Sequence, residues 1–316
     1  MNPKPRGFAR TTLRKLFSPL LSEFATTQRE MSALKMLAAQ PLCHRVRAIP
    51  QPGTLQDVEF KVFSQWGEDG IIEWLLSRIE ISNEQFVEFG VSDYQESNTR
   101  FLLKQHNWRG LVLDGSPANI DWIRHDEIYW QHELTAIAAF IDRDNINSLI
   151  RENGFSGDIG LLSIDLDGND YWIWKQIDVV SPRIVICEYN SVFGADHSIT
   201  VPYQADFNRT AAHYSNLYFG ASIQALCGLA EEKNYIFIGC TSAGNDAFFV
   251  RRDCAAGLRS VAPGVGYVES RARESRDQNG ALSHVSGKDR LALIKDCIVY
   301  DVVQEKTKRL QELFGV

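Results

Sequence analysis

Acidic side chains recur where short apolar runs of this chain end. Asp165 and Asp167 follow one such run, and Glu188 and Asn190 follow the next. Neighbouring parallel strands end at the same edge of a sheet, so these oxygen-bearing side chains should meet there. Together they predict a site for a hard cation such as Mg²⁺, or a clamp for substrate hydroxyls. The alternative for Asp167 is a turn before a helix.

Two earlier strand ends also carry ligand-binding residue types. Glu88 can act through its charge on a cationic ligand, while Gly90 allows close approach to the backbone. Asp114 ends the next apolar run, where its carboxylate can accept two hydrogen bonds from a ribose diol. The alternatives are a solvated strand-end turn for Glu88 and a helix cap for Asp114. No GxGxxG follows the first run, which disfavours a dinucleotide.

The segment 191–220 is long and has no strong periodicity, which is typical of a loop with a function. We interpret it as a cover over the substrate. His197 and His213 lie in it and are general-base candidates, since an unperturbed histidine titrates near pH ~6.5. The alternative is that both histidines are ordinary surface residues.

Strands alternating with helices must position these residues. Such alternation predicts an α/β fold with a mostly parallel sheet. The final two strands are joined by only six residues, 241–246, and should pair antiparallel. The predicted strands are 86–91, 110–114, 128–134, 159–165, 183–188, 235–240 and 247–251. The predicted helices between them are 97–106, 118–124, 145–152, 171–176 and 221–233.

The flanks of this region differ from it. Residues 1–53 predict an N-terminal arm, with a helix over 8–42 and a linker at 41–53 where prolines cluster. Residues 54–253 form the predicted catalytic domain. Residues 254–316 predict an extension of loops and a closing helix over 289–313. The basic start of the arm fits a solvated segment or a weak membrane-surface helix.

Composition excludes several classes of protein. The chain has 316 residues, 44% of them hydrophobic, and a net charge of −7. These values indicate a globular protein and disfavour a nucleic-acid binder, which is normally basic. No apolar stretch approaches the ~20 residues of a membrane span. The six cysteines form no CxxC pair, which predicts reduced thiols in a cytoplasmic protein. A homo-oligomer remains open.

Four motifs between residues 63 and 252 resemble the FkbM-type branch of S-adenosylmethionine-dependent methyltransferases. They are Ser-Gln-Trp-Gly-Glu-Asp-Gly at 64–70, Phe-Val-Glu-Phe-Gly-Val at 86–91, Trp-Arg-Gly-Leu-Val-Leu-Asp-Gly-Ser at 108–116 and Leu-Ser-Ile-Asp-Leu-Asp-Gly at 162–168. The chain departs from that family at Ser92 and Asp93, where many members have a second glycine, and in its Glu188-Tyr189-Asn190 strand end.

The resemblance implies a Rossmann-like class I methyltransferase fold with seven strands, the last antiparallel, and helices on both faces. It also implies methyl transfer from S-adenosylmethionine to a saccharide or small-molecule hydroxyl. The cluster of carboxylates, and not the resemblance, suggests assistance by Mg²⁺. The implied cofactor-binding residues are Gln65, Glu88, Gly90, Asp114, Gly115, Ser116, Leu134, Thr135 and Asp165. The proposed catalytic residues are Asp165, Asp167, Glu188 and His213, and the proposed metal ligands are Asp165, Asp167, Glu188 and Asn190.

Two other classes of function compete with this one. An NAD-dependent oxidoreductase uses a similar sheet, but the missing glycine triad and the antiparallel strand disfavour it. A non-catalytic scaffold would keep the fold and lose the cofactor, and the intact Glu88 and Asp114 disfavour that decay. A nucleic-acid methyltransferase is weaker still, because the net charge is negative.

Overall fold

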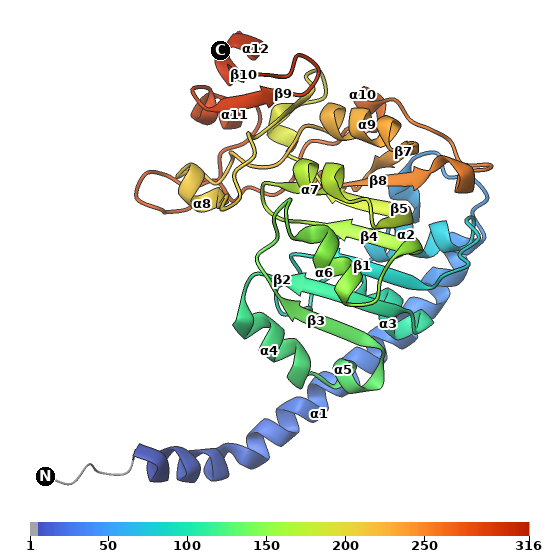
Figure 1. The fold of residues 1–316 in the computed structure, drawn as a ribbon. Helices are drawn as coiled ribbons and strands as arrows, with labels where there is room; N and C mark the ends of the chain where they lie inside the picture. Colours follow the sequence, from blue (N-terminus) through green and yellow to red (C-terminus); the bar gives the residue numbers. More distant parts are fainter. Residues whose placement is uncertain (1–5, 316) are drawn as a thin grey trace, which may run out of the picture.

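The computed structural model describes residues 6–315, and a seven-stranded sheet forms its centre (Figure 1). The strand order is β3-β2-β1-β4-β5-β8-β7. Only β8 runs antiparallel, pairing with β5 on one side and β7 on the other. The predicted Rossmann-like class I methyltransferase fold is therefore confirmed. The strands are β1 (Gln85–Phe89), β2 (Arg109–Asp114), β3 (Leu134–Ala138), β4 (Gly157–Ile164), β5 (Val180–Glu188), β7 (Tyr235–Cys240) and β8 (Asp246–Arg251).

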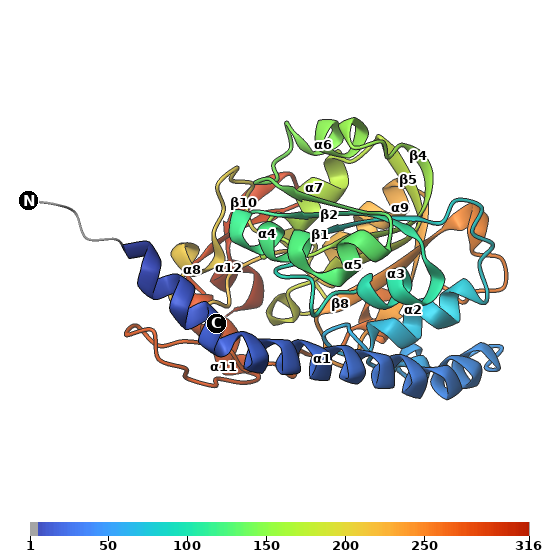
Figure 2. The same cartoon turned by 90° about the horizontal axis from the view of Figure 1, so that it is seen from below.

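Helices cover both faces of this sheet (Figure 2). Successive strand residues point to opposite faces, so Phe86 packs in one apolar core and Val87 in the other. The first core lies under the C-terminal part of α1 (Arg6–Arg47) and under α2 (Glu68–Leu76), α3 (Arg100–His106), α4 (Pro117–His125) and α5 (Glu127–Gln131). The second lies under α6 (Ile146–Glu152), α7 (Asp170–Gln176) and α9 (Ile223–Glu232).

The N-terminal helix is longer than predicted. We expected it to end near Leu42, with a linker from Pro41, but α1 continues through Pro41 to Arg47. A proline inside a helix costs about 3 kcal/mol. Cys43 and Val46 are buried in the first core, and their burial offsets that cost. Tertiary packing thus overrides the local breaker.

The third predicted strand, 128–134, is wrong. Residues 127–131 form α5, because the Asp126 carboxylate accepts a hydrogen bond from the Ile128 amide at 3.1 Å and caps the helix. The strand itself begins at Leu134, where it pairs with Gly110 of β2. Strand-forming residues such as Ile128 and Tyr129 therefore lie in a short helix that packs on the sheet.

The predicted closing helix over 289–313 is also wrong. This region contains α11 (Lys288–Ile294), a hairpin of β9 (Ile298–Asp301) and β10 (Lys306–Arg309), and α12 (Leu310–Phe314). β9 pairs antiparallel with β6 (Ile199–Thr200), so the small second sheet has the order β10-β9-β6. Pairing with a strand so distant in sequence leaves no signal in local periodicity. The remaining elements are η1 (Leu55–Val58), η2 (Ser191–Phe193), α8 (Arg209–Ala212), η3 (Arg252–Cys254) and α10 (Pro263–Gly266).

Composition led us to expect reduced thiols and no apolar stretch as long as a membrane span. All six cysteines are free, and four of them are buried. Among residues 6–315, no helix combines the length and the apolar character that crossing a bilayer requires.

Candidate functional site

Chain connections diverge between β1 and β4, which is the point where ligands bind in open α/β sheets. Gly90 follows β1 and Asp165 follows β4 at this point. Gly90 has φ +71°, and a Cβ on it would lie 1.8 Å from the Asp165 carbonyl oxygen. The glycine is therefore required by the contact between two strand ends, and not only by approach of a ligand.

Asp114 joins two of the loops at the same edge. Its Oδ2 accepts a hydrogen bond from the Ser92 amide at 2.8 Å. Its Oδ1 accepts bonds from the Ser116 amide at 2.8 Å and the Asn119 side chain at 3.0 Å. The N-cap of α4 is Ser116, so Asp114 is not the helix cap that the alternative interpretation proposed. The single bond at Oδ2 leaves that oxygen able to accept a ribose hydroxyl.

Glu88 lies one residue before the end of β1 and points into the first core, where it is 4% exposed. Its carboxylate accepts bonds from the Ser97 hydroxyl at 2.6 Å, the Asn98 amide at 2.9 Å and both the amide and the hydroxyl of Thr99. Burial raises its pKa and these hydrogen bonds oppose the rise. Glu88 therefore holds the β1–α3 segment in place.

The Ser64–Gly70 motif is a tight structural turn. The buried Asp69 carboxylate accepts bonds from three successive amides, those of Val62 and Phe63 at 2.7 Å and that of Ser64 at 2.9 Å. Glu68 is also buried, and its Oε1 has no hydrogen-bond partner. Gln65 is exposed at this turn. Its cofactor contact remains a prediction.

Three of the predicted carboxylates come together. Asp165, Asp167 and Glu188 each place an oxygen within 4.8 Å of the others. Solvent reaches Asp165, yet the protein atoms around its carboxyl group and the charges of Asp167 and Asp170 raise its pKa well above the ordinary value. Desolvation, and then the charges of Asp165, Asp167 and Asp170, raise the pKa of Glu188 well above its ordinary value. Its Oε2 is buried and has no hydrogen-bond partner within residues 6–315.

Further buried acids extend this cluster. Asp170 accepts bonds from the Leu166 and Gly168 amides, and desolvation raises its pKa to about 6. Asp246 begins β8 directly opposite Glu188, and its pKa is raised by desolvation and by the charge of Glu68. Such a set of crowded carboxylates favours a cationic ligand or bound protons.

Arg209 is the site residue that the sequence analysis missed. Its guanidinium donates to Asp167 Oδ1 at 2.7 Å, pairs with Glu274 and lies 3.7 Å from the centre of the Phe219 ring. Arg209 belongs to α8 in the predicted cover, and Glu274 to the C-terminal extension. The only sequence signal was Asn208, which caps α8 through the Ala211 amide at 2.9 Å.

The Asn190 side chain bonds to the cover segment, and its role as a metal ligand remains a prediction. Its Nδ2 donates to the carbonyls of Leu217 and Phe219, and its Oδ1 accepts from the Val192 amide. The side chain is 1% exposed and caps η2. Asn190 therefore anchors the cover segment.

The two histidines of the cover occupy different places. His213 Nδ1 lies 2.8 Å from the Ser215 hydroxyl, and burial lowers the pKa of the ring. Its catalytic role remains a prediction. The His197 ring contacts Phe314 of α12 with centroids 4.8 Å apart.

Leu134 and Thr135 are misplaced for the predicted adenine contact, because they begin β3 and the ligand edge lies at its other end. Ala139 and Phe140 follow β3 at that edge. Phe140 is 59% exposed, and its ring lies 3.7 Å from the place where a Gly115 Cβ would be. An exposed aromatic ring next to Asp114 offers a stacking surface.

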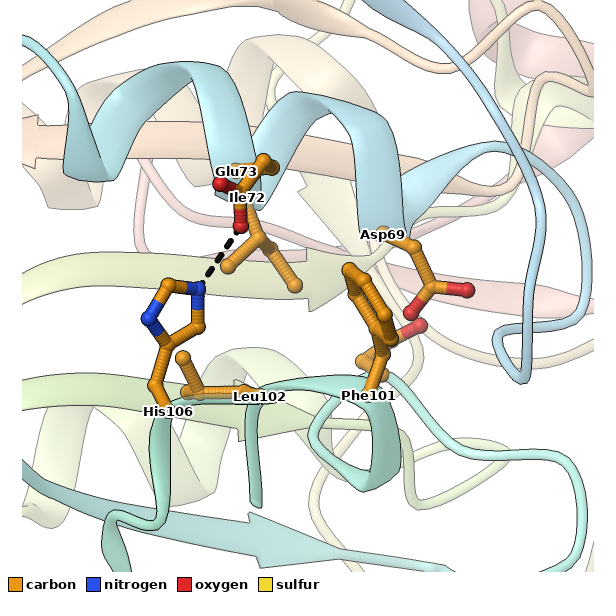
Figure 3. Close-up of a pocket in the computed structure, with 7 residues that line it drawn as sticks. Asp69, Ile72, Glu73, Phe101, Leu102 and His106 are labelled. Carbon is orange, nitrogen blue, oxygen red and sulfur yellow. Dashed lines mark hydrogen bonds and ion pairs between the residues drawn. The ribbon is translucent and has the colours of Figure 1, made fainter. Parts of the chain in front are cut away.

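Two concave places lie away from these residues. The gap between α2 and α3 is filled by Phe101, Leu102 and a Glu73–His106 pair at 2.8 Å, and it leaves no room for a water molecule (Figure 3). A second pocket of about 190 Å³ lies beside β7, between residues 51–56 and 257–268. Its walls are mostly apolar, and it contains none of the predicted site residues.

Comparisons with known proteins find distant likenesses of fold. No family model and no curated protein matches the sequence. The N-terminal domain of EvdMO1 with SAH bound is 12% identical with a TM-score of 0.40, covering 67% of this chain and 96% of that one. A putative O-methyltransferase from Klebsiella pneumoniae is 14% identical with a TM-score of 0.38, covering 71% and 97%. An O-methyltransferase from Bacillus cereus in complex with SAH is 14% identical with a TM-score of 0.32, covering 52% and 72%. These likenesses are too distant to assign an activity.

Proposed function

We propose that this protein is an S-adenosylmethionine-dependent methyltransferase that methylates a hydroxyl of a saccharide or another small molecule in the cytoplasm. The observation that carries the proposal is the strand order, which puts its switch point between Gly90 and Asp165 with Asp114 on the adjacent strand. A ligand at this point meets carboxylates on both sides.

The chemistry of this edge fits the cofactor. S-adenosylmethionine supplies a methyl group on a cationic sulfonium and also carries an ammonium group. The acids at the edge complement these charges, and the buried, unpartnered Oε2 of Glu188 is an acceptor that lacks a donor. Asp114 would bind the ribose through Oδ2, and Phe140 would stack on the adenine in place of the predicted Leu134 and Thr135.

The acid cluster would prepare the acceptor hydroxyl. An alcohol attacks poorly until its proton leaves, and a carboxylate with a raised pKa is a stronger base. Asp165 and Glu188 have this property. Asp165, Asp167 and Glu188 also have the oxygen donors that a Mg²⁺ ion prefers, and such an ion would lower the pKa of a bound hydroxyl.

Arg209 and the segment around it would cover the acceptor. The Arg209 pair with Asp167 fixes α8 near the three carboxylates, and Glu274 fixes the same guanidinium from the C-terminal extension. This arrangement would position an acceptor oxygen and restrict water, which supplies much of the acceleration of a displacement reaction. His213, in the same segment, is the alternative base.

Thermal unfolding with SAM, SAH or NAD, each with Mg²⁺ or with EDTA, tests the proposal. A ligand at a hundred times its dissociation constant adds about 2.7 kcal/mol, which should raise Tm by roughly 5 °C. We expect SAM and SAH to stabilise the protein and NAD to have no effect. Asp114→Asn should lose the shift, whereas Asp121→Asn, a change on the exposed side of α4, should keep it.

Two outcomes would contradict the proposal. Stabilisation by NAD without SAH would indicate an oxidoreductase. No shift with any nucleotide would indicate a non-catalytic scaffold. Normal methyl transfer by Asp165→Asn and Glu188→Gln variants in EDTA would leave the cofactor in place but remove the metal and the base from the proposal.

A further inference from the structure

The N-terminal half of α1 leaves the body of the fold (Figure 1). Its later part is held in place: Ala39, Cys43 and Val46 are buried, and Gln40 bonds to Gln105 at 3.0 Å. Arg29 pairs with Glu127 of α5. Another face of the same helix is exposed at the residues whose side chains the structure describes.

That face is apolar and exposed. Phe17, Leu20, Phe24, Met31 and Leu34 have between 47% and 63% of their surface open to solvent. Single exposed apolar residues are ordinary, but a row of large ones along one helix face marks an interaction surface. We call these five residues the α1 stripe.

The spacing of the α1 stripe selects a coiled coil. Phe17, Phe24 and Met31 are seven residues apart, and Leu20 and Leu34 lie three residues after the first and third of them. Thr27 completes the second pair. This is the a/d pattern of three heptads, with a period of 3.5 residues that matches a partner helix and not a flat surface.

The charged residues that flank the stripe favour a second copy of this chain, with its helix in the parallel orientation. Glu23 and Glu30 occupy the first two g positions, with the exposed Leu37 at the third, and Gln28 and Lys35 occupy the last two e positions after Leu21. In a parallel pair of identical helices, Glu30 of each copy lies next to Lys35 of the other, which gives two equivalent ion pairs. Glu23 of each copy lies next to Gln28 of the other. An antiparallel pair would set the glutamates against each other.

We propose that this protein forms a parallel homodimer through a coiled coil of the α1 stripe. The contacts that α1 makes with the body of the fold come from residues outside the stripe, among them Arg29, Gln40 and the buried Ala39, Cys43 and Val46. The Lys35 ammonium lies 5.3 Å from the centre of the Phe63 ring and remains exposed, so it can reach a glutamate of the second copy.

Sedimentation equilibrium of the full chain tests the dimer. We expect the mass to rise with concentration from 35.8 kDa to twice that value. Phe24→Glu and Leu34→Glu should keep the protein monomeric throughout the same range. Ala33→Glu places the same charge at an exposed position outside the stripe and should leave the dimer intact. Unchanged circular dichroism would show that every variant is folded.

A charge exchange tests the parallel direction. Glu30→Lys or Lys35→Glu alone should weaken dimerisation about tenfold, since each turns two attractive pairs into repulsive ones. The two changes combined should restore it. With a mild oxidant, Met31→Cys should cross-link to itself and Ala33→Cys should not.

Two results would overturn the proposal. One is a monomer at every concentration, including a monomer that co-sediments with phosphatidylglycerol vesicles, which would make the stripe a membrane-surface helix. The other is a dimer that survives Phe24→Glu and Leu34→Glu together.

Discussion

Replacing Gly90 with alanine should destabilise the whole fold, because the residue joins two strand ends. The added Cβ would lie 1.8 Å from the Asp165 carbonyl oxygen, and the backbone at φ +71° is unfavourable for alanine. The left-handed conformation costs about 1–2 kcal/mol. Relief of the overlap by moving a packed backbone adds about 1–3 kcal/mol. We therefore expect a loss of about 3 kcal/mol in the free energy of unfolding.

Urea unfolding followed by tryptophan fluorescence measures this loss, which corresponds to a fall in Tm of roughly 6 °C. Gly157→Ala is the matched control, since Gly157 has φ +69° and no atom within 4 Å of an added Cβ. The control should lose only the conformational part. Equal losses at both positions would refute the contact between the strand ends as the reason for glycine, and would leave ligand approach as the explanation.

Three further outcomes follow from the site, and a fourth from the ring beside it. In EDTA the protein should become more stable as pH falls from 8 to 5, because Asp170, with a pKa of about 6, stabilises the fold when protonated and loses that effect as pH rises through 6; a flat Tm profile would contradict this. Glu188→Gln should stabilise the metal-free protein by about 1 kcal/mol at pH 8 and flatten that profile, since it removes a buried charge whose Oε2 has no hydrogen-bond partner among the described residues. Arg209→Met should cost about 1 kcal/mol, because Asp167 is largely exposed, and should speed proteolysis within 203–220; unchanged cleavage would mean that other contacts hold the cover. Phe140→Ala should weaken SAH binding about tenfold without changing Tm, as a calorimetric titration would show, because the exposed ring would contribute stacking and little packing.

The elements that the sequence predicts well are those with a strong local pattern. Apolar runs of strand length alternate with amphipathic segments, and six residues between the last two strands leave no alternative to antiparallel pairing. These patterns led to the sheet and to its carboxyl edge. Once the edge is known, the meeting of Asp165, Asp167 and Glu188 follows, because strands β4 and β5 are neighbours.

The remaining features depend on partners that are distant in the chain. Asn190 is a residue type that can bind a metal ion, but its Nδ2 donates hydrogen bonds to the carbonyls of Leu217 and Phe219. Arg209 is unremarkable in sequence and becomes the counter-charge of the acids only when the cover folds back over them. β9 exists because β6 offers it an edge.

Residue type and spacing thus determined where charge and apolar surface lie along this chain. Tertiary structure decided which of those groups meet, because burial and hydrogen-bond satisfaction are settled between elements and not within them. Glu88 illustrates the difference. The sequence predicts its position near the end of β1. Its four hydrogen-bond donors come from residues 97–99, and the path of that segment depends on the packed fold.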